Sequence, residues 1–243
     1  MASEIYLSVI IPAYNEEKRL PKTLKEIDEY LKKQSFESEI VVISDGSTDR
    51  TCEIVETLKS EIKNLGLICE KINRGKGYGV KIGMLNAKGK FRLFTDADNS
   101  TPISEIEKFW PEFEKGADIV IASRDLKGAI LDPPQTLFRR FVGEVFKYLR
   151  KIIVGLWEIE DSQCGFKCFK GEVADKIFPK CKIQRFAFDP EVLLIAKKIG
   201  FKIKEVPVYW KNDLRSKVKF KSMVKMLIDL FKIRINLLKG EYG

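Results

Sequence analysis

The segment Leu93-Phe94-Thr95-Asp96-Ala97-Asp98 has the pattern of a short buried strand that ends in two carboxylates. Side chains at positions i and i+2 of an extended backbone point the same way. Asp96 and Asp98 can therefore direct oxygens toward one point, where two negative charges repel unless a cation lies between them. Mg²⁺ and Mn²⁺ prefer oxygen ligands, so the pair predicts a metal site. The simpler alternative is a strand followed by a polar turn.

The chain on either side of this segment alternates strand and helix patterns. Strand patterns cover residues 5–11, 39–44, 67–72, 92–95 and 118–122, and helix patterns cover residues 19–33, 47–63, 101–114 and a segment opened by residues 75–79. This alternation predicts an α/β fold with a parallel sheet covered on both faces. Three strand ends carry acids, namely Glu16, Asp45 and the Asp96/Asp98 pair. Since ligands of such sheets bind at the carboxyl ends of the strands, we expect a site for a metal and a polar ligand there.

A glycine-rich segment, Gly75-Lys76-Gly77-Tyr78-Gly79, follows the third predicted strand. Its position and spacing fit neither the dinucleotide-binding fingerprint nor the Walker loop. It is either a flexible turn or a place where the backbone approaches a diphosphate, with Lys76 adding positive charge.

The second half of the chain is less regular. Residues 125–135 contain Pro133-Pro134 and indicate a loop, whereas apolar residues recur at helical spacing over 138–156. That helix is either an ordinary core helix or a membrane-facing one. Its opposite face is predicted to carry Arg139, Arg140, Lys147 and Arg150. A polar turn at 160–167, a helix opened by 188–191 and a strand at 202–209 complete this region.

The tail is strongly basic, with eight Lys or Arg and one acidic residue over 215–239. Residues 217–238 are predicted to form a helix with Met223, Leu227, Leu230, Leu237 and Leu238 on one face and Lys221, Lys225, Lys232 and Lys239 on the other. The apolar runs are too short to span a bilayer. Such a helix either lies in the plane of an anionic membrane surface or docks on the core with a solvated basic face.

Cysteine and histidine usage restricts the compartment and the chemistry. Five cysteines show no regular pairing pattern and no signal peptide is evident, which favours a reducing compartment. The chain has no histidine, so the commonest general base is missing. A carboxylate or the substrate itself must then take up any proton.

Four segments match one family in order and spacing: Val-Ile-Ile-Pro-Ala-Tyr-Asn-Glu at 9–16, Val-Ile-Ser-Asp-Gly-Ser-Thr-Asp at 42–49, Asn-Arg-Gly-Lys-Gly at 73–77 and Thr-Asp-Ala-Asp at 95–98. They resemble the inverting family-2 glycosyltransferases. The resemblance implies a Rossmann-like GT-A catalytic domain over residues 1–210, with a mostly parallel sheet flanked by helices. A basic amphipathic membrane-interface helix over 211–243 is expected to follow it. Residues 122–124, 161–167 and 215–217 are similar to the dolichyl-phosphate sugar synthases, more to the β-glucosyltransferases than to the mannosyltransferases.

The resemblance also implies roles for individual residues. The implied nucleotide-binding residues are Pro12, Tyr14, Asn15, Glu16, Asp45, Lys76, Asp96 and Ala97. The implied catalytic residues are Asp96, Asp98, Asp161 and Arg124, with Mg²⁺ or Mn²⁺ on Asp96 and Asp98, and the implied acceptor-phosphate residues are Arg124, Arg215, Ser216 and Lys217. A glutamine that helps to bind metal in the mannosyl branch is replaced here by Ser100. The N-terminal membrane anchor of eukaryotic glucosyl-branch members is not expected in this chain.

The reaction implied is transfer of a hexose, glucose from UDP-glucose, to a polyprenyl or dolichyl phosphate at the cytoplasmic face of a membrane. The acceptor phosphate, with a second pKa near ~6, is largely dianionic at neutral pH and needs no base. Alternatives are a mannose synthase that uses GDP-mannose, and transfer to a sugar hydroxyl with Asp161 or Asp189 as base. A sugar nucleotidyltransferase and a non-catalytic basic adaptor are further alternatives. The acidic strand ends argue against a nucleic-acid partner.

Overall fold

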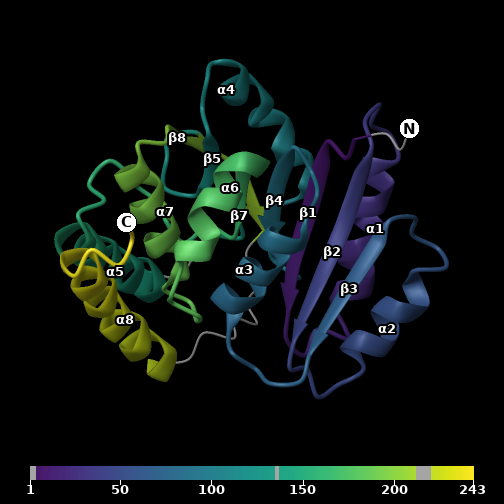
Figure 1. The fold of residues 1–243 in the computed structure, drawn as a ribbon, viewed down its shortest axis with the longest axis horizontal. Helices are drawn as coiled ribbons and strands as arrows, with labels where there is room; N and C mark the ends of the chain where they lie inside the picture. The colour runs from purple at the N-terminus through teal and green to yellow at the C-terminus, as the bar shows by residue number, and fades with distance from the viewer. Residues whose placement is uncertain (1–3, 135–136, 212–219) are drawn as a thin grey trace.

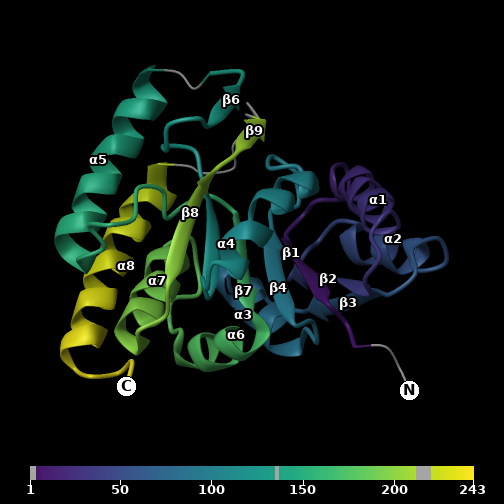
Figure 2. The same ribbon diagram turned by 90° about the horizontal axis from the view of Figure 1, so that it is seen from above.

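The computed structural model describes residues 4–134, 137–211 and 220–243, and within them the chain forms one large sheet (Figure 1) and one small one (Figure 2). The large sheet has seven strands in the order β3-β2-β1-β4-β7-β5-β8, and the small sheet pairs β6 with β9. The strands are β1 (Leu7–Ala13), β2 (Ser38–Asp45), β3 (Leu65–Glu70), β4 (Phe91–Thr95), β5 (Ile119–Ser123), β6 (Ile130–Asp132), β7 (Phe166–Lys170), β8 (Ile203–Pro207) and β9 (Tyr209–Lys211). The expected α/β architecture is confirmed.

Helices cover both faces of the large sheet, as Figure 2 shows. One face packs under α1 (Leu20–Leu31), α2 (Thr51–Leu58), the 3₁₀ helix η1 (Ile103–Lys108) and α4 (Trp110–Glu114). The other packs under α3 (Lys76–Asn86), α5 (Leu137–Val154), α6 (Gly171–Ile177), the 3₁₀ helix η2 (Phe178–Lys180), α7 (Phe188–Ile199) and α8 (Phe220–Leu238). Because each face has its own helices, β1 and β4 are buried on both sides, which explains their nearly continuous apolar sequences.

Strands β3, β2, β1 and β4 are parallel, so the carboxyl ends of these strands share one edge of the sheet. Helix α3 lies unusually close to β1 and β2. An added Cβ at Gly83 would lie 2.3 Å from Ile10 Cγ2 and 2.6 Å from Ile43 Cδ1. The glycine therefore lets α3 run directly over the sheet, and its N-terminus reaches the carboxyl edge.

The sheet is mostly parallel, as expected, and within the large sheet the exception is β7. This strand lies between β4 and β5 and runs antiparallel to both. Its first residue, Phe166, pairs with Thr95 at the end of β4. The segment that precedes β7 is therefore delivered to the same edge as the carboxyl ends of the parallel strands.

Three further element expectations need correction. Helix α2 covers Thr51–Leu58 instead of residues 47–63. It begins late because Ser47 and Thr48 bond to Asn15 instead of capping a helix. The helix expected over 101–114 is split into η1 and α4, and the break lies beside Pro111, which has no N–H for a helical hydrogen bond. The loop expected over 125–135 contains β6, which pairs with β9.

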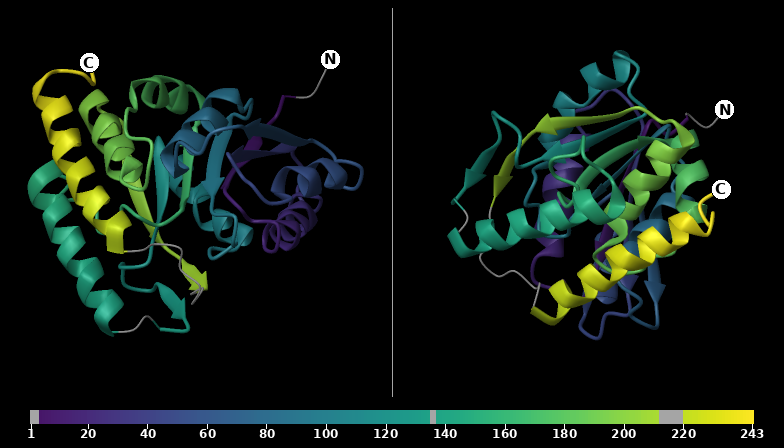
Figure 3. Two further views of the ribbon diagram at one scale, coloured as in Figure 1. Left: turned by 90° about the horizontal axis from the view of Figure 1, so that it is seen from below. Right: turned by 90° about the vertical axis from the view of Figure 1, so that its left-hand side faces the viewer.

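Helices α5 and α8 lie side by side at one end of the molecule (Figure 3). Leu230 and Ile233 of α8 are fully buried in the core cluster on that face, so α8 is packed on the rest of the fold. Two side chains differ from expectation. Arg150 is buried and donates to the carbonyls of Leu156 and Ile159, and Leu238 is 72% exposed. Among the described helices, none combines the length and apolar character that a bilayer crossing needs.

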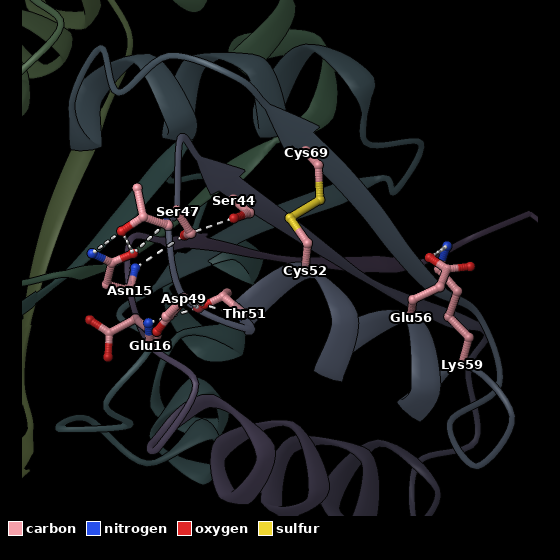
Figure 4. Close-up of a disulfide and its surroundings, with 11 residues drawn as sticks. Asn15, Glu16, Ser44, Ser47, Asp49, Thr51, Cys52, Glu56, Lys59 and Cys69 are labelled. Atoms are coloured by element: carbon pink, nitrogen blue, oxygen red, sulfur yellow. Dashed lines mark hydrogen bonds and ion pairs between the residues drawn. A yellow bond between two sulfur atoms is a disulfide. The ribbon is translucent and has the colours of Figure 1, made fainter.

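A disulfide joins Cys52 of α2 to Cys69 of β3 (Figure 4). The expectation that the cysteines have no pairing is therefore wrong for these two. The sequence separation is 17 residues, and the pair meets because α2 packs against the β2–β3 edge of the sheet. Cys164, Cys168 and Cys181 are free thiols and are buried. The disulfide removes the main argument for a reducing compartment.

Candidate active site

The loop after β1 is held to the loop after β2, as Figure 4 shows. The backbone N–H of Asn15 donates to Ser47 Oγ at 3.1 Å, and Asn15 Oδ1 accepts from the backbone N–H of Thr48 at 2.8 Å. Glu16 is buried, and its two carboxylate oxygens accept from Arg19, both at 2.7 Å. Asn15 has a positive φ of 54°, which asparagine tolerates. These bonds fix the shape of the first loop of the predicted nucleotide site.

The other predicted nucleotide-binding residues near this loop lie at the same edge. Pro12 is buried in β1, and the N-terminal turn of α3 passes over it at Gly79. Tyr14 is exposed just beyond the end of β1. The carbonyl of Ala97 accepts a hydrogen bond from Thr23 of α1 at 2.9 Å, which ties the turn after β4 to that helix.

Asp45, at the end of β2, shapes the glycine-rich loop. Its Oδ1 accepts from the backbone N–H of Arg74 at 3.0 Å, and its Oδ2 accepts from that of Gly75 at 2.6 Å. Gly75 has a φ of +121°, and an added Cβ would lie 2.6 Å from the carbonyl oxygen of Gln184, so only glycine fits. This turn places Lys76 at the first position of α3, whose N-terminus points toward the edge of the sheet.

Asp96 and Asp98 follow β4, and each faces a cation. Lys76 Nζ lies 2.5 Å from Asp96 Oδ1, and an Arg19 guanidinium nitrogen lies 3.5 Å from Asp98 Oδ2. Burial and the neighbouring negative charge of Asp96 raise the pKa of Asp98 above its ordinary value. The backbone N–H of Ser100 also donates to Asp98, at 3.1 Å. The two carboxylates are thus close enough to repel each other.

Gly165 lies against the Asp96 carboxylate, a contact that sequence reasoning missed. An added Cβ at Gly165 would lie 2.1 Å from Asp96 Oδ2 and 2.5 Å from its Cγ. The contact exists because β7 is antiparallel and begins beside the end of β4. The absence of a side chain at Gly165 therefore fixes where the Asp96 carboxylate can lie.

Asp161 and Arg124 form a buried bidentate ion pair. Arg124 Nε lies 2.7 Å from Asp161 Oδ2, and its second nitrogen lies 3.0 Å from Oδ1. The backbone N–H groups of Arg124, Gln163 and Cys164 also donate to Asp161. Burial alone would raise the pKa of Asp161, but the charge and hydrogen bonds of Arg124 outweigh it and hold the pKa well below its ordinary value. Asp161 is therefore a very weak base.

A second buried ion pair joins Lys167 of β7 to Asp189 of α7. Lys167 is fully buried, its Nζ lies 2.6 Å from Asp189 Oδ1, and it also donates to the carbonyl of Cys164 at 2.5 Å. This edge of the sheet is thus shaped by three residues of the segment 161–167, namely Asp161, Gly165 and Lys167. A signal was available, since a lysine inside a buried strand pattern demands a carboxylate partner.

The structure brings most predicted site residues to one edge. Arg215, Ser216 and Lys217 lie outside the described residues.

Within the described ranges no group of three or more His, Cys, Asp or Glu side chains could hold a metal ion. The carboxylates of Asp96 and Asp98 still fit a hard divalent cation, because both offer oxygens and their mutual repulsion calls for positive charge. A cation there must complete its ligand set from the substrate or from water.

The model of glycosyl transferase family 2 matches residues 8–178, which is more than half of the chain. The chain belongs to this family. The matched region of the family-2 domain contains Asp45, the glycine-rich loop, the Asp96/Asp98 pair and the Asp161–Arg124 ion pair.

Relatives of this glycosyltransferase include dolichyl-phosphate β-glucosyltransferases from three organisms. ALG5A of Trichomonas vaginalis is 39% identical over 96% of this chain and 74% of its own length. The Dictyostelium discoideum protein is 39% identical over 97% and 76%, and the Saccharomyces cerevisiae protein is 34% identical over 98% and 77%. The similarity therefore extends through the tail as well as the family-2 region.

Solved structures show the same fold at low sequence identity. Glucosyl-3-phosphoglycerate synthase of Mycobacterium tuberculosis, in complex with Mn²⁺, UDP and glucosyl-3-phosphoglycerate, has a TM-score of 0.69 at 17% identity, over 95% of this chain and 80% of that one. Mannosyl-3-phosphoglycerate synthase of Rubrobacter xylanophilus has a TM-score of 0.71 at 16% identity, over 98% and 75%. The glycosyltransferase fold predicted from the sequence motifs is thus confirmed.

Proposed function

We propose that this family-2 enzyme transfers glucose from UDP-glucose to dolichyl phosphate or another polyprenyl phosphate, with inversion at the anomeric carbon. The observation that carries the proposal is the 39% identity, over 96% of the chain, to a protein named dolichyl-phosphate β-glucosyltransferase. The edge of the sheet supports it, because it holds two carboxylates for a metal and a lysine at a helix N-terminus for a diphosphate.

The donor end of the site needs positive charge when the diphosphate leaves. Asp96 and Asp98 would hold Mg²⁺ or Mn²⁺, which would stabilise the charge that develops on the leaving group. Glucosyl-3-phosphoglycerate synthase, which has a similar fold, was crystallised with Mn²⁺ and UDP, and this supports the proposal of a divalent cation. Lys76 and the backbone N–H groups of the first turn of α3 supply charge from this chain itself.

The acceptor is expected to react without a protein base. A phosphate dianion attacks directly, whereas a sugar hydroxyl must lose a proton. The two carboxylates considered as general base already form ion pairs. Asp161 pairs with Arg124, and Asp189 is buried against Lys167. Asp161 has a pKa far too low for a general base at neutral pH. This favours the phosphate acceptor, and Asp161 then acts by holding Arg124 in place.

A membrane surface is proposed for the outer side of α5 and α8. Helix α8 buries one stripe on the core and exposes a second, formed by Val224, Ile228, Phe231, Ile235 and Leu238. On the neighbouring helix α5, Val145, Tyr148 and Ile152 are exposed. Exposed Lys225, Lys232, Arg234 and Lys239 accompany the apolar stripe. We call these residues the α5–α8 surface. Apolar side chains mixed with basic ones suit the interface of an anionic membrane on the cytoplasmic side, where a lipid acceptor would be met.

One experiment tests the reaction. Purified protein is incubated with Mg²⁺ or Mn²⁺ and a polyprenyl phosphate, with UDP-glucose or GDP-mannose in parallel, and lipid products are analysed by mass spectrometry. We expect glucosyl-phosphate lipid from UDP-glucose. Product only from GDP-mannose would overturn the donor, and transfer to a sugar hydroxyl without lipid product would overturn the acceptor.

A second experiment tests the membrane surface. Phe231→Asp is expected to reduce co-sedimentation with anionic liposomes several-fold, because it places a charge in the apolar stripe. Leu85→Asp, at an exposed apolar position on α3, is the matched control and is expected to bind as the parent does. Equal binding of all three proteins would contradict the membrane assignment. A concentration-dependent change in oligomeric state, abolished by Phe231→Asp, would assign the surface to a second copy of the chain instead.

A further inference from the structure

Both carboxylates of the predicted metal site are paired with a cation of the protein itself. Lys76 Nζ lies 2.5 Å from Asp96 Oδ1, and Arg19 approaches Asp98 Oδ2 at 3.5 Å. The cations come from different elements, since Lys76 opens α3 and Arg19 immediately precedes α1. The two contacts thus neutralise the carboxylate pair from two sides.

A metal ion and the Lys76 ammonium would compete for Asp96. Mg²⁺ binds oxygen at about 2.1 Å, so an ion on Asp96 and an ammonium 2.5 Å from the same carboxylate would be close neighbours of like charge. Binding of the metal therefore requires Lys76 to withdraw or to gain a new anionic partner.

Lys76 is held in place by its surroundings. Its side chain is only 20% exposed, and its Nζ lies 2.5 Å from Asp96 Oδ1. Its ammonium also lies 5.9 Å from the ring centre of Phe94 and 6.0 Å from that of Phe188. An ammonium held by a charge-assisted contact leaves its carboxylate when a second anion offers contacts of the same kind, so the partner that draws Lys76 away from Asp96 must itself be an anion.

The diphosphate of a nucleotide sugar is the anion that fits. It would meet Lys76 at the N-terminus of the 11-residue helix α3, where backbone N–H groups are also directed outward. It would also supply further oxygen ligands, because the described residues offer no cluster of three or more His, Cys, Asp or Glu side chains that could hold a metal ion. The diphosphate thus gives Lys76 a new anionic partner and completes the set of oxygen ligands around the metal.

We infer that Lys76, assisted by Arg19, is an internal counter-ion that occupies the metal site until the donor diphosphate arrives, so that metal and donor bind cooperatively. The inference rests on the proposed function, because it takes the donor to be a nucleoside diphosphate sugar. It assigns Lys76 a role in metal binding in addition to its contact with phosphate. The metal alone is then bound weakly, and the protein avoids holding a cation in a site without substrate.

The test is a titration of the purified full chain with Mn²⁺, with free Mn²⁺ measured by electron paramagnetic resonance, in the absence and presence of UDP. For the parent protein we expect UDP to tighten Mn²⁺ binding by about tenfold or more. Lys76→Met is expected to tighten Mn²⁺ binding in the absence of UDP by about tenfold and to shrink the effect of UDP. Arg19→Met should act in the same direction but less strongly, because Arg19 is farther from Asp98 and is shared with Glu16.

Lys81→Met is the matched control on the same helix. Lys81 is engaged by the carbonyls of Pro179 and Cys181, to which it donates, rather than by either metal carboxylate, so Mn²⁺ binding should be unchanged. Circular dichroism confirms that each variant is folded. Unchanged or weaker Mn²⁺ binding by folded Lys76→Met without nucleotide would overturn the counter-ion role. Failure of UDP to bind, with GDP binding instead, would overturn the proposed donor and leave the Mn²⁺-only comparison valid.

Discussion

Replacing Gly165 by alanine tests whether the antiparallel strand β7 sets the position of the metal carboxylate. The new Cβ would lie 2.1 Å from Asp96 Oδ2, whereas non-bonded carbon and oxygen atoms normally stay about 3.5 Å apart. The carboxylate must therefore move by more than about 1 Å. A misplacement of about 1 Å at a reacting centre can cost about 10²-fold in rate, or about 2.7 kcal/mol of transition-state stabilisation.

The fold should tolerate this change. The side chain of Asp96 is 36% exposed and can swing toward solvent, and Gly165 does not have a positive φ. We expect the free energy of unfolding of Gly165→Ala to change by less than about 1 kcal/mol. The assay combines kcat for lipid glucosylation, Mn²⁺ binding in the presence of UDP, and thermal unfolding.

Gly143→Ala provides the control. Gly143 lies in α5, and an added Cβ would meet no atom within 4 Å, so activity should be unchanged. Wild-type kcat and Mn²⁺ binding in Gly165→Ala would refute the reasoning, because the Asp96 carboxylate would then be shown not to depend on the glycine. A large loss of stability with no separate loss of activity in the folded fraction would refute it as well.

Three further perturbations probe the site and its scaffold. Asp161→Asn leaves Arg124 buried without its counter-charge and should lower the free energy of unfolding by about 3–5 kcal/mol in urea titrations. Because the folded pKa of Asp161 is depressed, its stabilisation is present above about pH 3.9 and is lost as pH falls through the folded pKa. The melting temperature of the parent should therefore fall more steeply than that of Asp161→Asn below about pH 4, and parallel curves would contradict the ion-pair reasoning. Cys52→Ser opens the 17-residue link to Cys69 and should cost about 3 kcal/mol, and dithiothreitol should lower the stability of the parent equally while leaving Cys52→Ser unaffected. Asp98→Ala should abolish transfer with an unchanged circular dichroism spectrum, and retained turnover by the purified variant would remove Asp98 from the metal site.

The carboxyl edge of the sheet could be predicted because its signals are local. A buried strand followed by a polar turn marks where each strand ends, and parallel strands place all such ends together. That reasoning located Asp45, Asp96 and Asp98 correctly at one edge. The glycine-rich loop was likewise visible, and its special backbone is confirmed at Gly75.

The remaining features depend on contacts between segments distant in sequence. Nothing in the pattern of residues 166–170 tells the direction of β7, so the contact of Gly165 with Asp96 could not be foreseen. The pairing of Cys52 with Cys69 depends on how α2 packs on the sheet edge. Arg150 looked like a surface residue because helical spacing does not reveal that its guanidinium binds the carbonyls of the following segment.

The direction of β7 also has a consequence for the order in which the enzyme is assembled. Strands β1 to β4 are complete once Thr95 has been synthesised, whereas their partner β7 comes only at Phe166–Lys170. Pairing across so long an intervening segment carries a loop-closure cost and is slow compared with local contacts. A nascent chain that ends before β7 thus presents its acidic turn without the strand beside it. We expect insertion of β7, which joins β5 to β4, to be the step that completes the site, so that activity appears only after this strand has entered the sheet.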